Sequence, residues 1–64
     1  MTVHEKIKQL DGNAQPGGIG WCWADFPTHE AALEFDVWCE ANNLETRGVY
    51  PPNKADERWS VRYR

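Results

Sequence analysis

The sequence predicts a small α+β domain, and three patterns carry that prediction. Residues 28–43 fit an amphipathic helix, residues 19–26 and 58–64 alternate in polarity as strands do, and Gly and Pro residues separate the segments. We expect one domain over residues 1–64, in the order α-β-α-β-β, with a three-stranded mixed sheet packed against the central helix. A chain this short buries only about 60% of its unfolded surface, so its eight aromatic residues matter to the core.

Residues 2–11 are expected to form a short helix. Thr2 and Glu5 have the spacing of a capping box, in which each side chain binds the other residue's backbone amide. One apolar stripe follows the helical period, and its members are Val3, Ile7 and Leu10. Gly12 suits the C′ position, and residues 13–18 are expected to form a loop. Its glycines precede a strand, whereas a phosphate loop opens a helix, so we reject a phosphate loop.

The first strand is expected over residues 19–26. Small Cys22 and Ala24 would face the central helix, and bulky Trp21 and Trp23 would lie on the opposite face of the sheet. We expect the N-terminal helix to fold over that opposite face and bury both indoles, because large exposed apolar patches are uncommon on monomers. The alternative is an exposed pair of Trp side chains, which would indicate a binding partner.

The central helix should begin after Thr28, a good N-cap, and end at Asn42 and Asn43. Its core face is expected to comprise Ala31, Ala32, Phe35, Trp38 and Cys39. A second apolar strip comprises Leu33, Val37 and Ala41. We expect the N-terminal segment to cover this strip; the alternatives are a partner protein or a homodimer interface.

Two further strands are expected over residues 45–50 and 58–64, joined as a hairpin across a polar loop. Gly48 indicates a bulge or a close backbone approach in the earlier strand. In the later strand Trp59, Val61 and Tyr63 alternate with Arg58, Ser60, Arg62 and Arg64. The sequence leaves open whether this last strand lies at an edge or between the other two.

Charge is unevenly distributed along the chain. Residues 25–45 contain six acids and no Lys or Arg, whereas residues 46–64 sum to +3. The net charge of −3 argues against general nucleic-acid binding. No apolar run is long enough to span a bilayer and no signal pattern is present, so we expect a cytoplasmic protein.

The sequence does not indicate an enzyme, a metal site or a cofactor. Cys22, His29 and Cys39, with His4, lack the close Cys pairs of a zinc site. A Cys–His nucleophile pair would lack an orienting third group. Two cysteines do not make a disulfide framework. Cys22 and Cys39 could meet in space, but in a reducing compartment we expect both to be buried thiols.

Two binding functions remain. In the first, the chain is a protein-binding module whose acidic helix docks on a basic partner, using Glu30, Glu34, Asp36 and Glu40 with Trp21 and Trp23. Short chains of this size and charge from phages and mobile elements often inhibit host defence or nucleic-acid-handling systems, which is an analogy and not a motif. In the second, Trp21 and Trp23 stack on single-stranded nucleic acid while Arg47, Arg62 and Arg64 neutralise phosphates. The second function requires the indoles and the arginines on one face.

Overall fold

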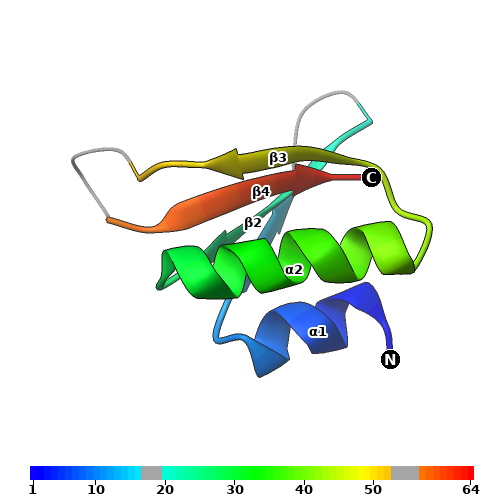
Figure 1. Ribbon diagram of the computed structural model, residues 1–64, viewed down its shortest axis with the longest axis horizontal. Helices are drawn as coiled ribbons and strands as arrows, with labels where there is room; N and C mark the ends of the chain where they lie inside the picture. The colour runs from blue at the N-terminus through cyan, green and yellow to red at the C-terminus, as the bar shows by residue number, and fades with distance from the viewer. Residues whose placement is uncertain (17–19, 53–56) are drawn as a thin grey trace.

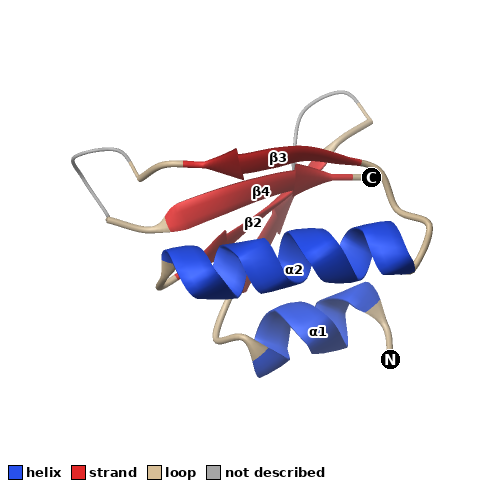
Figure 2. Ribbon diagram, in the orientation of Figure 1, coloured by secondary structure: helices blue, strands red, loops and turns tan. Residues whose placement is uncertain are grey.

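Two helices cover one face of a four-stranded sheet, so the chain is an α+β domain (Figure 1). The computed structural model describes residues 1–16, 20–52 and 57–64. The elements are α1 (Val3–Gln9), β1 (Asn13–Pro16), β2 (Cys22–Phe26), α2 (His29–Ala41), β3 (Thr46–Tyr50) and β4 (Trp59–Tyr63). The helices lie side by side on the same side of the sheet, and no helix of the described residues covers the other sheet face (Figure 2).

The strand order is β1-β2-β4-β3, and every neighbouring pair is antiparallel. The expected three-stranded mixed sheet is therefore wrong in both strand number and strand direction. The last strand, β4, lies between β2 and β3, which settles the position that the sequence left open. The hairpin of the last two strands is confirmed, and Gly48 lies in the predicted bulge with a φ of 87°.

The additional strand, β1, lies in the segment that was expected to be a loop. Asn13 to Pro16 pairs with Asp25 to Cys22 at the edge of the sheet. Asn and Pro are poor strand formers, and an edge strand needs little propensity because its neighbour supplies the hydrogen bonds. The expected start of the first long strand at Ile19 lies outside the described residues.

Both helices begin as predicted. Thr2 and Glu5 form the capping box of α1, and the Thr28 hydroxyl accepts a hydrogen bond from the Ala31 amide at 3.1 Å. At the end of α2, Asn43 takes a φ of 62° and the Leu44 amide donates to the Cys39 carbonyl at 2.9 Å. This is the left-handed ending for which Asn is suited.

The core lies between the helices and the sheet. Its buried members are Ile7, Ala24, Phe26, Ala32, Phe35, Cys39, Val61 and Tyr63. At the end of α1 the left-handed residue is Asp11, with a φ of 58°, and not Gly12 as expected. Gly12 serves a different purpose, because a Cβ there would lie 2.6 Å from the Phe26 ring. The chain after α1 can therefore approach the core closely.

Helix α1 was expected to cover the sheet face with Trp21 and Trp23 and the second apolar strip of α2, and both expectations are wrong for the same reason. Helix α1 packs beside α2, where Ile7 joins the core and Lys6 pairs with Glu34 at 3.0 Å. It therefore does not cover the sheet face that carries Trp21 and Trp23. Nor does it cover the second apolar strip of α2, where Leu33 is 43% exposed and Val37 is 63% exposed.

Candidate functional site

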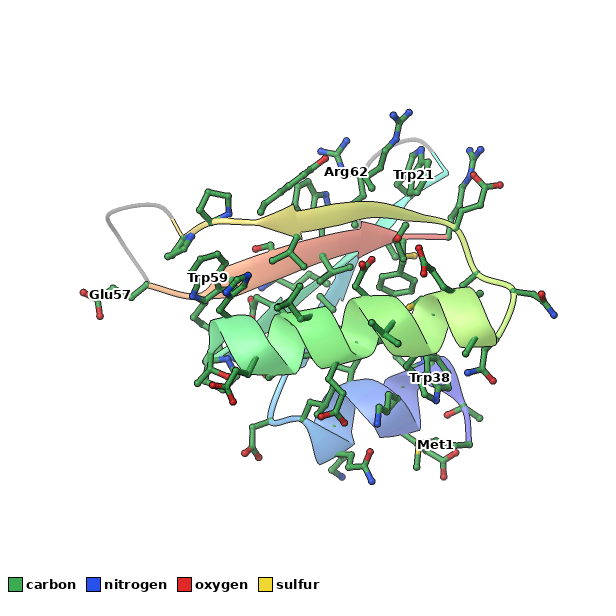
Figure 3. The ribbon with its side chains drawn as sticks, in the orientation of Figure 1. Met1, Trp21, Trp38, Glu57, Trp59 and Arg62 are labelled. Carbon is green, nitrogen blue, oxygen red and sulfur yellow. The ribbon has the colours of Figure 1, made fainter. Side chains whose placement is uncertain are left out.

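The candidate site is the sheet face that points away from the helices, here called the free face. Strand register assigns its rows: Gln15, Trp23 and Arg62 lie side by side on β1, β2 and β4. In the next row Asp25 pairs with both Asn13 and Ser60, and Ser60 pairs with Tyr50 of β3. Figure 3 shows Trp21 and Arg62 on this side of the sheet, whereas Trp38 and Trp59 lie on the helix side.

Arginine and aromatic side chains alternate over this face. The guanidinium carbon of Arg62 lies 4.3 Å from the ring centroid of Trp23 and 5.6 Å from that of Tyr50. Arg64 lies 4.3 Å from the Trp21 ring, and Arg47 lies 5.2 Å from the same ring. These distances are those of cation–π contacts. We call this group, which comprises Trp21, Trp23, Arg47, Tyr50, Arg62 and Arg64, the Trp–Arg face.

The arginines of the Trp–Arg face keep most of their charge available. Among the described residues, Arg47 and Arg62 have no carboxylate partner, while Arg64 pairs with Glu45 at 3.1 Å. Both members of that pair are largely exposed, so the pair is worth little energy. The Arg62 Nε is buried and has no hydrogen-bond partner among the described residues. Each of the three arginines therefore lies against an aromatic ring, and only Arg64 also has a carboxylate partner among the described residues.

A hollow of about 270 Å³ adjoins the Trp–Arg face. It is lined by Gln15, Trp23, Ala24, Asp25 and Ser60. Beside it the Asp25 carboxylate is fixed, because Oδ1 accepts from Arg58 Nε at 2.7 Å and Oδ2 accepts from Gln15 Nε2 at 3.0 Å. The acceptor-rich hollow and the arginines thus lie on the same face of the sheet.

The acidic residues of α2 do not form one uniform surface. Glu30 and Glu40 are exposed, but Glu34 is bound by Lys6. Asp36 is half-buried, and its Oδ1 is buried with no hydrogen-bond partner among the described residues. Leu33 and Val37 lie between these acids on the outward side. The outward surface of α2 is therefore apolar in its middle and acidic at its rim.

The two cysteines are free thiols, but the expectation that both are buried is wrong for Cys22. Cys22 is exposed, whereas Cys39 is buried, and burial together with the nearby Asp36 charge raises the pKa of the Cys39 thiol to about 11. A thiol with a raised pKa is a poor nucleophile at neutral pH. His29 stacks on Trp59 at 4.2 Å. No group of three or more His, Cys, Asp or Glu side chains in the described segments is placed to hold a metal.

Sequence reasoning identified Trp21, Trp23, Arg47, Arg62 and Arg64 but missed four residues of the face. Tyr50 and Ser60 could have been assigned to it from the alternation of their strands. Asp25 was counted only as an acid, and Gln15 was assigned to a loop. Neither helix in the described part of the chain is long and apolar enough to cross a membrane. No protein-family model matches the chain, and neither curated proteins nor solved structures give a significant match.

Proposed function

We propose that this chain is a non-enzymatic module that binds single-stranded nucleic acid on its Trp–Arg face. One observation carries the proposal: two Trp–Arg pairs stand in adjacent rows of the free face, each with a ring-to-guanidinium distance of 4.3 Å. Positions two residues apart on a strand are about 7 Å apart. The rings thus offer successive stacking platforms, and each platform has a cation beside it for a phosphate.

The distribution of charge supports the proposal despite the net negative charge of the chain. Helix α2, which carries these acids, covers the opposite face of the sheet from the Trp–Arg face (Figure 1). The core lies between this helix and the sheet. At physiological salt, interactions between exposed charges are screened over about 8 Å. The local charge of the free face therefore governs its contact with a polyanion, and the acidic side orients the module with its sheet toward the strand.

The test is a titration with a 12-nucleotide oligo(dT) at low salt, followed by Trp fluorescence. We expect quenching, because Trp21 and Trp23 would stack on bases. We also expect affinity to fall with salt with a logarithmic slope of about −2, as three arginines would release two to three counterions. Arg47→Ala should reduce that slope by about 0.7.

The matched control is Lys8→Ala, which removes an exposed cation from α1 on the other side of the molecule. Its slope should equal that of the unmodified chain. A blunt duplex of the same length should bind less well, because its bases are not free to stack. If the oligonucleotide leaves Trp emission unchanged at low salt, the proposal is wrong.

A second candidate function is supported by the outward surface of α2. The exposed side chains of Leu33 and Val37, rimmed by Glu30, Glu34 and Glu40, are suited to a basic partner protein with an apolar groove. Such docking would block the groove. Inhibitors encoded by phages or mobile elements can act in this way on the nucleic-acid-handling proteins of a host. Trp21 and Trp23, which were expected to contribute to this docking surface, lie on the opposite side of the sheet and play no part in it.

The second candidate predicts the effect of charge reversal. Replacing Glu34 and Glu40 by Lys should abolish capture of the partner in a pull-down, because like charges would then face each other. The reversal also removes the ion pair of Glu34 with Lys6, but Glu34 is 59% exposed and such a pair is worth little, so circular dichroism should show an intact fold. Trp23→Ala, on the opposite side, should leave capture unchanged. Capture that survives the double reversal would rule out the acidic rim as the docking surface.

A further inference from the structure

The hollow beside Trp23 is lined by residues of β1, β2 and β4, and no arginine of the described residues is among them. Register places Arg62 of β4 on one side of Trp23 and Gln15 of β1 on the other. The Trp23 ring contacts Tyr50 of β3 edge to face at 5.4 Å, although β4 lies between the two strands. The ring contacts of Trp23 thus lie toward β4 and β3, while the hollow reaches Gln15 on β1. Its volume of about 270 Å³ is sufficient for one nucleobase.

The polar groups around this hollow are mainly hydrogen-bond acceptors. Each oxygen of a carboxylate accepts up to two hydrogen bonds, so Asp25 Oδ2, which binds Gln15 Nε2, has capacity for another. When Gln15 donates through Nε2, its carbonyl oxygen is a further acceptor. The Ser60 hydroxyl, which either donates or accepts, also lines the hollow. A ligand that presents donors therefore suits the open acceptors of Asp25 and Gln15 in this hollow.

Three contacts fix the carboxylate before any ligand arrives. Arg58 and Asn13 donate to Asp25 Oδ1 at 2.7 and 3.4 Å, and Gln15 donates to Oδ2 at 3.0 Å. The Asp25 side chain is 16% exposed, which is low but leaves it within reach of a ligand. A preorganised acceptor loses little entropy on binding. Its negative charge also repels phosphate, so a base and not the backbone of a strand fits here.

We propose that this hollow is a base-specific subsite for guanine. The guanine edge carries two adjacent donors, N1–H and the N2 amino group. Asp25 Oδ2 would accept from one of them and the Gln15 carbonyl oxygen from the other. Thymine and uracil flank their single N–H with two carbonyl oxygens, and these would face the Asp25 carboxylate unfavourably. Cytosine and adenine place an acceptor nitrogen next to their amino group. The ring would stack on Trp23 while Arg62 neutralises the neighbouring phosphate.

This inference depends on the proposed function, because the strand must first lie on the Trp–Arg face. The test compares three labelled nonanucleotides by fluorescence anisotropy at one salt concentration: dT9, the same strand with a central guanine, and the same strand with a central hypoxanthine. Hypoxanthine keeps N1–H and lacks only the N2 amino group. We expect the guanine strand to bind about tenfold tighter than dT9, with hypoxanthine between them, since hydrogen bonds to a charged acceptor are the strong ones.

Substitutions in the lining of the hollow test whether it is the source of the preference for guanine over thymine. Asp25→Asn should bring the guanine-to-thymine affinity ratio close to one, because the amide presents a donor where the base also has donors. Since this change also affects the ion pair with Arg58, Gln15→Ala and Ser60→Ala supply independent tests, and each should lower the ratio. Lys8→Ala on α1 is the control and should leave the ratio unchanged.

The outcomes separate the two proposals. Equal affinities for all three strands would overturn the guanine subsite and leave the proposed function standing. Binding of none of them would overturn both. Free dGMP should compete only at far higher concentration, because it lacks the contacts of the flanking nucleotides. If dGMP binds as tightly as the guanine strand, the hollow is a mononucleotide site, and the proposal of a subsite in a strand is wrong.

Discussion

Phe35→Ala should lower the free energy of unfolding by about 3–5 kcal/mol, which is the usual cost of removing a buried aromatic ring. Phe35 is fully buried, and its ring lies 5.1 Å from Phe26 and 5.3 Å from Tyr63. It therefore joins α2 to two neighbouring strands at once. A domain of this length has roughly 3–10 kcal/mol of stability in total, so this substitution should remove a large part of it. Urea denaturation followed by circular dichroism measures the change.

The matched control is Leu33→Ala, two residues earlier in the same helix. Leu33 is 43% exposed, and its truncation should change stability by no more than about 0.5–1 kcal/mol. Ala also has the higher helix propensity, so the helix itself is not weakened. If the two variants unfold at the same urea concentration, Phe35 is not at the centre of the core.

The central helix could be predicted from the sequence because its information is local. Thr28 and Asn43 determine its two ends through contacts with residues three or four positions away. The helical period then identifies the buried side, including Phe35 and Cys39. The same applies to β4, where Val61 and Tyr63 alternate with Ser60 and Arg62. Such patterns are independent of how distant segments pair.

The parts that were predicted wrongly depend on distant contacts. Strand β1 exists because β2 offers it an edge, and nothing in Asn13–Pro16 itself favours a strand. The placement of α1 follows from the close approach at Gly12 and from the packing of Ile7 into the core. Periodicity identified the apolar side of this helix but not the element against which that side packs. Leu33 and Val37 were expected to be covered because exposed apolar strips are uncommon, and this statistical argument does not say which element covers them.

In the candidate site, too, local patterns could be predicted and the pairing of distant segments could not. Alternation alone placed Trp21 and Trp23 on one face of their strand and Arg62 and Arg64 on one face of theirs. Whether these two faces coincide depends on strand order, which the sequence left open. Once β4 lies against β2 in its observed register, Trp23 and Arg62 must be neighbours. The hollow was out of reach for sequence reasoning, because its wall includes Gln15 on the unexpected strand β1.

Trp23→Ala should weaken oligonucleotide binding by about 10- to 100-fold, since stacking of one base on an aromatic ring is worth roughly 1–3 kcal/mol. The effect should be at the upper end because the Trp23 ring also positions Arg62, whose guanidinium lies 4.3 Å from it. Loss of the ring therefore removes a stacking platform and the support of a cation. Anisotropy of a labelled oligo(dT) measures the affinity without relying on Trp emission.

A conservative substitution at Trp23 separates the loss of stacking from other effects of the Ala variant. Trp23→Phe keeps an aromatic face and should bind only a few-fold less tightly, because base stacking tolerates any ring. Trp38→Phe is the same chemical change on the helix side of the sheet, where the strand does not reach, and should leave affinity unchanged (Figure 3). Circular dichroism establishes that each variant is folded. A folded Trp23→Ala variant that binds as tightly as the unmodified chain would show that the strand does not lie on the Trp–Arg face.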